Sequence, residues 1–265
     1  MNNLEIQMVE SLKELKGKYG AVSVKAEFEA EGTRLEELLR LKEICMSAGV
    51  KVALKIGGCE SLRDILESKV VGVDVLVAPM VETAYALRKY LQAVAKVFSA
   101  EEIKDLAILT NIETATAIEN FKAMLAIPEI HLLKGIVIER YDLFSSMGRG
   151  EDYLDSKELN EIVGSVCSLA KKMNLACYVG GGVSAQHISL FKTIECLDFY
   201  ETRKVCFDAR AAFKTDAEKG ILKALGFELL WIKNKLNFNN GIQATDVARM
   251  NTLEQSYRKA IDELI

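Results

Sequence analysis

Two carboxylates, Glu113 and Asp142, lie at the ends of two apolar stretches of the sequence. Residues 106–113 and 135–142 each resemble a buried β-strand, and a helical pattern follows the first at once and the second after a short loop. In a parallel β/α protein the carboxyl ends of the strands form the floor of the active site. Two carboxylates there suit a hard cation such as Mg²⁺ or Mn²⁺. Alternatively, each acid caps the next helix or pairs with a nearby Lys or Arg.

Strand-like and helix-like segments alternate along the chain, which predicts a parallel sheet with helical crossovers. The strand candidates are residues 21–29, 51–56, 73–79, 106–113, 135–142, 175–180 and 197–207. We therefore predict an α/β fold, a (β/α)8 TIM barrel with an irregular or missing first strand, for which residues 4–6 are a candidate. An open, doubly wound sheet is the alternative, although no GxGxxG turn follows the first strand.

The chain has only two prolines and no low-complexity linker, so we expect a single catalytic barrel over residues 1–236. Residues 237–265 form the second predicted unit, a C-terminal helical extension that begins with a loop. A terminal helix of this kind packs back on the barrel or crosses to a neighbouring subunit. The second arrangement is the one we expect, and it implies a homo-oligomer.

The composition excludes several classes of partner. A net charge of −4 with well-mixed charges argues against nucleic acid or an anionic membrane surface. The six cysteines form no CxxC pair, and the sequence shows no signal peptide, so we expect reduced thiols in a cytoplasmic protein. Only two histidines occur, His131 and His187, without a GxSxG motif, which favours surface or helix-capping roles over a catalytic triad.

Side chains alternate along strands, and this alternation predicts which charges face the barrel interior. It directs Lys25, Glu27 and Glu29 inwards from the first strand and Lys55 inwards from the second. It also groups Asn111 with Glu113, groups Arg140 with Asp142, and places Arg203 and Lys204 close together in the last strand. Buried charges are costly unless they are paired or bind a ligand. An internal network of ion pairs explains part of this set, and a site for a small anionic substrate and a divalent cation explains why the charges gather at strand ends.

A glycine-rich turn, residues 178–184 (YVGGGVS), leads from a strand towards a helix. Ser184 is a good helix N-cap, and exposed N–H groups at such a turn bind phosphate or carboxylate well. We therefore consider Gly181 and Gly182 as substrate-binding residues. The three glycines fit a tight strand-to-helix turn equally well.

Three stretches resemble the 2-keto-3-deoxy acid aldolase and citrate lyase β-subunit family, over roughly residues 20–185. They are residues 77–84 (VAPMVETA), 111–115 (NIETA) and 138–148 (IERYDLFSSMG). The resemblance implies a phosphoenolpyruvate/pyruvate-type barrel in which Glu113 and Asp142 hold the metal ion. It further implies an enolate stabilised by that ion, with Lys55 nearest to the family's carboxylate-binding Arg and Asn111 in place of a Gln.

The chain also departs from the family pattern. No His occurs where the family uses one for acid–base chemistry, because the corresponding residues 27–30 are EFEA. Glu139 and Arg140 replace small residues that let backbone N–H groups reach the substrate, and Ser146 replaces a second Asp. These changes fit a larger or phosphorylated substrate better than ordinary pyruvate chemistry.

Our first hypothesis is a carbon–carbon lyase, dependent on Mg²⁺ or Mn²⁺, that acts on a keto acid or an acyl-CoA-like substrate. Glu27 or Glu29 would move the proton, with Lys55 as a further catalytic residue. The expected substrate-binding residues are Lys55, Asn111, Arg140, Gly181, Gly182, Arg203 and Lys204. The alternatives are a phosphosugar isomerase or synthase that relies on the glycine turn, and a non-catalytic ligand-binding barrel.

Overall fold

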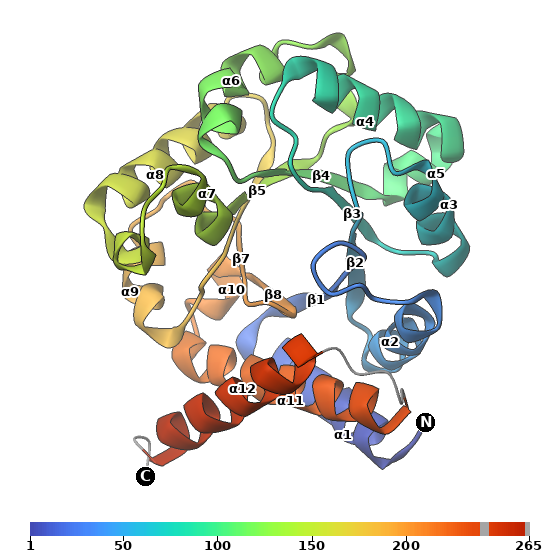
Figure 1. Cartoon of the computed structure of the whole chain (residues 1–265), viewed down its shortest axis with the longest axis vertical. Helices are drawn as coiled ribbons and strands as arrows, with labels where there is room; N and C mark the ends of the chain where they lie inside the picture. Colours follow the sequence, from blue (N-terminus) through green and yellow to red (C-terminus); the bar gives the residue numbers. More distant parts are fainter. Residues whose placement is uncertain (239–243, 263–265) are drawn as a thin grey trace.

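The computed structural model describes residues 1–238 and 244–262, which form a closed barrel surrounded by helices (Figure 1). The strands are β1 (Ala21–Glu27), β2 (Lys51–Lys55), β3 (Val75–Ala78), β4 (Ala107–Ile112), β5 (Gly135–Glu139), β6 (Ala176–Gly180), β7 (Phe199–Glu201) and β8 (Val205–Asp208). The α-helices are α1 (Asn3–Tyr19), α2 (Leu35–Ala48), α3 (Leu62–Val71), α4 (Ala84–Val97), α5 (Ala100–Asp105), α6 (Ala115–Leu125), α7 (Arg140–Ser146), α8 (Lys157–Lys171), α9 (Ile188–Phe191), α10 (Ala209–Ala212), α11 (Ala217–Phe238) and α12 (Ala244–Asp262). Short 3-10 turns are η1 (Pro128–Leu132), η2 (Glu151–Asp155) and η3 (Ala185–His187).

The barrel closes through an antiparallel hairpin. Strands β1 to β7 pair in parallel in chain order, whereas β8 runs antiparallel to both β7 and β1. The predicted strand over residues 197–207 therefore splits into β7 and β8. Thr202 closes the turn, since its backbone N–H donates to the Val205 carbonyl at 2.9 Å and its hydroxyl accepts from the Val205 N–H at 3.1 Å.

The eighth strand thus lies at the end of the barrel and not at its start. Residues 4–6, the predicted candidate, belong to helix α1, whose N-cap Asn2 forms a reciprocal capping box with Glu5. The turn between β7 and β8 could not be recognised in the sequence, because the turn contains no Gly, Pro, Asn or Asp.

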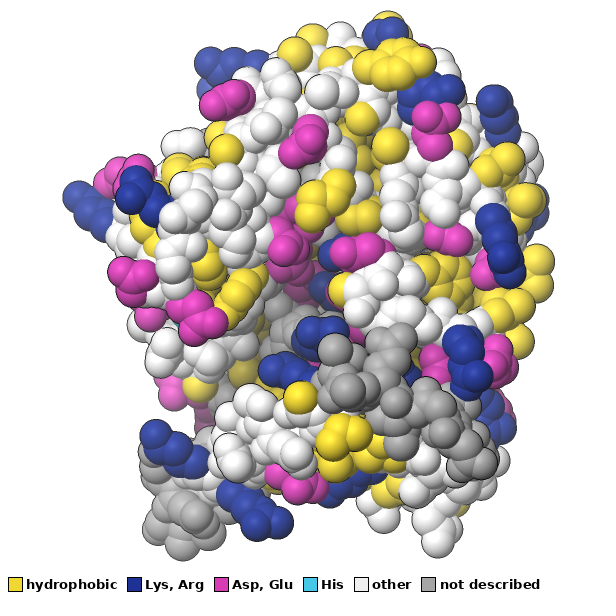
Figure 2. Space-filling view, viewed as in Figure 1, with side chains coloured by type: hydrophobic (Ala, Val, Ile, Leu, Met, Phe, Trp, Pro, Cys, Tyr) yellow, Lys and Arg dark blue, Asp and Glu magenta, His cyan; other side chains and the backbone are white. Residues whose placement is uncertain are grey.

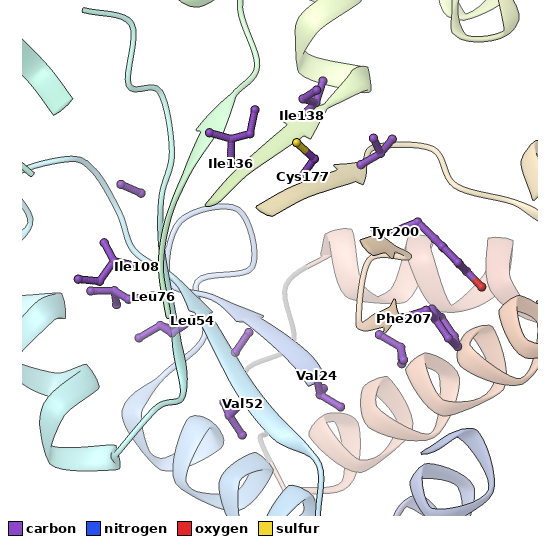
Figure 3. Close-up of a cluster of buried hydrophobic side chains, with 14 of the residues drawn as sticks. Val24, Val52, Leu54, Leu76, Ile108, Ile136, Ile138, Cys177, Tyr200 and Phe207 are labelled. Carbon is purple, nitrogen blue, oxygen red and sulfur yellow. The ribbon is translucent and has the colours of Figure 1, made fainter. Parts of the chain in front are cut away.

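Alternation along the strands separates two buried layers. Side chains that point outwards pack beneath the helices, among them Val52, Leu54, Leu76, Ile108 and Ile136 (Figure 3). The inward side chains at the amino ends of the strands form a smaller apolar cluster of Ala53, Val75, Val77, Leu109 and Val137. The next inward position on three of these strands is polar: Lys55, Asn111 and Glu139. The barrel therefore has an apolar base and a charged upper layer.

Helices α1, α11 and α12 lie together on the side of the barrel formed by β1 and β8 (Figure 1). Helix α12 packs on α11 of its own chain: Arg249 pairs with the buried Glu228 at 3.0 Å, and Leu253 is buried. The predicted loop falls partly on residues 239–243, which lie outside the described residues, and the predicted contact with a neighbouring subunit stays a prediction. Among the described residues no helix is both long and apolar enough to cross a membrane.

Candidate functional site

A cavity of about 450 Å³ opens at the carboxyl ends of the strands. Figure 2 shows acidic and basic side chains gathered in the hollow at the centre of this face. Its charged lining residues are Lys25, Glu27, Glu29, Lys55, Glu139, Asp142, Glu201, Arg203 and Arg249. The cavity occupies the position at which β/α barrels carry their active sites.

Lys25 is the centre of a buried ion cluster. Its ammonium group lies 2.7 Å from a carboxylate oxygen of Glu201, 3.2 Å from Glu27 and 3.4 Å from Glu139. Burial by itself would lower the pKa of Lys25, but the three carboxylates outweigh burial and hold that pKa well above its ordinary value. Lys25 is therefore a fixed positive charge, and it confirms that part of the interior is a self-paired ionic network.

Glu27 and Glu139 both contact Lys25, but their pKa values shift in opposite directions. Burial favours the neutral form of Glu27, yet Lys25 and Lys55 overcome it and lower the pKa to about 2. For Glu139, burial is the largest influence, Lys25 opposes it, and the neighbouring Glu201 adds to it, so the pKa rises to about 7. Glu139 is thus the carboxyl group that can hold or release a proton near neutrality.

Lys55 lines the cavity, and Glu113 lies behind it, outside the lining residues. The Lys55 ammonium lies 3.1 Å from Glu29 and 4.0 Å from Glu113, whose side chain is almost fully buried. Glu113 accepts hydrogen bonds from the backbone N–H of Met80 at 2.6 Å and from the Asn111 amide at 2.8 Å. Met80 adopts a φ of 52°, in the left-handed region, where its N–H reaches Glu113. These contacts fix Glu113 at the end of β4, as the sequence predicted.

Asp142 differs from its predicted place. Strand β5 ends at Glu139 and α7 begins at Arg140, so Asp142 lies in the first turn of a helix and not at a strand end. It is exposed and lines the cavity, and in the part of the chain that the structure describes its carboxylate has no hydrogen-bond or ion-pair partner. Burial chiefly raises the pKa of Glu113, Lys55 opposes the rise, and the charge of Asp142 adds a smaller contribution to it.

These two carboxylates fit a magnesium site of the open kind. Mg²⁺ takes one or two protein carboxylates and fills its other positions with water and substrate oxygens. The free carboxylate of Asp142 and the buried negative charge of Glu113 supply such a donor set beside an open cavity. No group of three or more His, Cys, Asp or Glu able to hold a metal occurs within residues 1–238 and 244–262.

Arg203 and Lys204 lie in the β7–β8 turn, where both pair with Glu31. Arg203 lines the 450 Å³ cavity, whereas Lys204 is buried and faces a neighbouring cavity of about 520 Å³ between this turn and α11 and α12. The structure therefore brings Arg203, but not Lys204, to the proposed substrate cavity.

The glycine turn after β6 is packed tightly against β5. A Cβ on Gly180 would lie 2.6 Å from the Glu139 carboxylate, and one on Gly181 would lie 2.6 Å from the backbone nitrogen of Tyr141. Gly181 and Gly182 also have positive φ angles of 74° and 65°. Gly181 and Gly182 line the cavity. A tight strand-to-helix turn is sufficient to explain all three glycines, Gly180 included.

Arg140 points away from the cavity. Its guanidinium lies 5.0 Å over the Phe191 ring and donates through Nε to the Gly180 carbonyl at 3.3 Å. Its two terminal nitrogens have no hydrogen-bond partner in the described residues, and burial lowers the pKa to about 10. The prediction that Arg140 faces the barrel interior together with Asp142 is wrong: Arg140 is buried outside the cavity lining, and Glu139 takes the inward position.

The histidines lie outside the cavity lining. The predicted surface position of His187 is wrong, because the residue is buried. Its predicted capping role is confirmed. Its Nδ1 accepts from the Ser184 N–H at 3.0 Å, and its Nε2 lies 2.9 Å from Asp155. His131 is exposed and bonds to the Pro128 carbonyl.

Comparisons with known proteins agree with this geometry. The model of the HpcH/HpaI aldolase/citrate lyase family matches residues 33–186, more than half of the chain. The fold is similar to an HpcH/HpaI aldolase from Desulfitobacterium hafniense DCB-2 (16% identity, 83% of this chain and 88% of that chain, TM-score 0.59). It is also similar to a family protein from Burkholderia cenocepacia J2315 (12%, 85% and 100%, 0.57) and to the citrate synthase SbnG (13%, 87% and 90%, 0.59). No curated protein matches the chain.

The fold and the cavity define a β/α-barrel enzyme with its charged groups at the carboxyl ends of the strands. The chain belongs to the HpcH/HpaI aldolase/citrate lyase family, which makes it an enzyme of the carbon–carbon lyase type.

Proposed function

We propose that the protein is a divalent-metal-dependent carbon–carbon lyase that acts on a keto acid or an acyl-CoA-like substrate. The additional charged residues of the site would also accommodate a large or phosphorylated substrate. The observation that supports this proposal is that Asp142 lines the cavity and Glu113 lies 4.0 Å from the cavity-lining Lys55, both inside the region matched by the family. The carboxylate of Asp142, which has no hydrogen-bond or ion-pair partner in the described residues, is available for a ligand.

Glu113 and Asp142 would hold Mg²⁺ or Mn²⁺, and the bound ion would stabilise the negative charge of an enolate. Lys55, 4.0 Å from Glu113, would bind the substrate carboxylate by exchanging its ion pair with Glu29. The Oδ1 atom of Asn111 is buried without a hydrogen-bond partner among the described residues, so it is a free acceptor beside Glu113.

The remaining predicted residues contribute from the other walls. Arg203 and the backbone of Gly181 and Gly182 line the cavity and would bind further anionic groups of the substrate. Glu27 and Glu29, the predicted proton-transfer groups, also line it, although the low pKa of Glu27 makes that residue a weak base.

The test is isothermal titration of Mg²⁺ and Mn²⁺ into metal-free protein, with and without oxalate, which mimics the enolate of pyruvate. We expect oxalate to bind only when the metal is present, and we expect Glu113→Gln and Asp142→Asn each to abolish that binding because each removes a charged ligand. The isosteric substitutions keep the shape of the cavity, so loss of binding would report the lost charge.

Matched controls are Glu119→Gln on α6 and Asp105→Asn on α5, which change exposed carboxylates away from the cavity. Both should bind metal and oxalate as the wild type does. Binding that survives in Glu113→Gln and Asp142→Asn would overturn the metal assignment. Turnover that persists after exhaustive chelation would favour the phosphosugar hypothesis, and ligand binding without turnover across a panel of keto acids would favour a non-catalytic barrel.

A further inference from the structure

Glu139 is the inward-facing side chain of β5 that has no place in the family pattern. It follows the inward Val137 by two residues and lines the cavity. The turn after β6 leaves room for it, because a Cβ at Gly180 would lie 2.6 Å from one carboxylate oxygen and a Cβ at Gly181 would lie 2.7 Å from the other. Two consecutive glycines therefore accommodate this carboxyl group at the floor of the site.

The charges that surround Glu139 come from three other strands. Lys25 and Glu27 face it from β1, Lys55 from β2 and Glu201 from β7, while Gly180 of β6 and Gly181 in the following turn approach its carboxylate. Lys25 gives its short 2.7 Å hydrogen bond to Glu201 and only a 3.4 Å bond to Glu139. Among the described residues this is the sole hydrogen bond that Glu139 receives, so its negative charge is the least compensated of the three carboxylates around Lys25.

Other proton carriers at this cavity are less suitable. Glu27 is held ionised by the cations around it, with a pKa of about 2, and Glu29 is paired with Lys55 at 3.1 Å. His131 and His187 are absent from the cavity lining. The pKa of Glu139, about 7, matches what a general acid–base group requires at neutral pH.

We propose that Glu139 is the catalytic acid–base residue of this enzyme. This inference rests on the proposed lyase function. In the cleavage direction the Glu139 carboxylate takes the proton from the substrate hydroxyl, whose oxygen becomes the carbonyl of the aldehyde or ketone product as the carbon–carbon bond breaks. The bonding electrons pass to the keto-acid fragment as its enolate, and Glu139 returns the proton to the enolate carbon. Condensation runs through the same steps in reverse.

The test uses exchange of the methyl protons of pyruvate for deuterium, followed by NMR with the metal-loaded protein in D₂O. This reaction isolates the transfer between Glu139 and carbon, and it needs no knowledge of the second substrate. We expect the wild-type rate to fall as the pH drops below about 7, and Glu139→Gln to exchange about 10²–10⁴-fold more slowly. Glu139→Asp should keep a measurable rate, and the exposed control Glu119→Gln should match the wild type.

A second readout does not depend on activity. Difference infrared spectroscopy of the metal-free protein should show one protonated carboxyl group that titrates near pH 7 and is absent from Glu139→Gln. If Glu139→Gln exchanges pyruvate protons as fast as the wild type does, the proposed role of Glu139 is overturned and the lyase proposal stands. No exchange in the wild type with any keto acid would overturn the lyase proposal itself, even if the infrared titration were found.

Discussion

Lys25 shows how the charges of the site are balanced at the scale of single residues. It neutralises part of a cluster of three buried carboxylates, and the other cations of the cavity also have carboxylate partners: Lys55 with Glu29, Arg203 with Glu31. An anionic substrate must therefore exchange for one of these internal partners. Burial raises the pKa of Glu139, and Lys25 compensates its charge too weakly to offset burial and the neighbouring Glu201.

The raised pKa of Glu139 predicts an unusual dependence of stability on pH. The pKa of Glu139 rises from 4.5 to about 7 on folding, so between these values the folded protein binds more protons than the unfolded chain. The stabilisation is fully present below pH 4.5 and is lost as the pH rises through about 7. Glu139→Gln should therefore gain roughly 1–3 kcal/mol relative to the wild type on going from about pH 5 to about pH 8, measured by urea unfolding.

Glu27→Gln is the matched control for this experiment. The pKa of Glu27 falls to about 2 on folding, so its stabilisation is present above 4.5 and is lost only as the pH falls towards 2. Its difference from the wild type should be nearly constant between about pH 5 and about pH 8. A Glu139→Gln protein with the same pH slope as the wild type would contradict the prediction.

At the scale of elements, the turn after β6 packs closely against the start of α7. Strand β5 pairs with β6 so that Glu139 lies opposite Gly180, and the chain then turns directly into α7 at Arg140. Gly181 lies against the backbone nitrogens of Arg140 and Tyr141, at distances that leave no room for a side chain. The glycines thus position Glu139 and the α7 turn that carries Asp142.

Two glycine substitutions separate steric contact from backbone strain. Gly72, at the end of α3, has a φ of 69° but no atom within 4 Å of an added Cβ, whereas Gly181 has a φ of 74° and a contact at 2.6 Å. Gly72→Ala should cost about 1–2 kcal/mol of stability from the left-handed backbone. Gly181→Ala should cost about 1–3 kcal/mol more from overpacking.

Chemical denaturation of both variants measures this difference. Gly181→Ala should also weaken the metal-dependent binding of oxalate, because the displaced α7 backbone carries Asp142. Equal stability losses in the two variants would show that the turn is looser than the contacts indicate.

At the scale of the whole molecule, α12 packs on α11, and one of the contacts between them is an ion pair with a buried acid. Glu228 on α11 is 1% exposed and accepts two hydrogen bonds from Arg249 of α12, at 3.0 and 3.2 Å. Arg249 also lines the cavity, so the C-terminal helix contributes to the rim of the site. The packing of α12 and the shape of the cavity are therefore coupled.

Arg249→Met should destabilise the protein because it leaves the Glu228 carboxylate buried without its partner. Removing one member of a fully buried pair costs about 3–5 kcal/mol, and the partial exposure of Arg249 reduces the expected loss to about 1–3 kcal/mol. Urea unfolding measures the loss, and hydrogen exchange should show α12 opening. The double variant Glu228→Met/Arg249→Met should recover most of the stability, and a double variant as unstable as Arg249→Met would contradict this account.

The sequence by itself determined the alternation of strands and helices, the inward direction of Lys25, Glu27 and Lys55, and the position of Glu113. These features follow from local periodicity, since side chains alternate with a period of two in any strand. The family resemblance was also visible in short motifs, and the family match confirms it.

Only the tertiary structure decided how the barrel closes and which acid can exchange a proton. The β8 strand depends on pairing with β1, far away in the sequence, and its turn carries no typical turn residue. The end of β5 at Glu139 and the buried position of Arg140 likewise follow from neighbouring elements. The pKa of Glu139 depends on burial and on charges from β1, β2 and β7, which meet only in the folded chain.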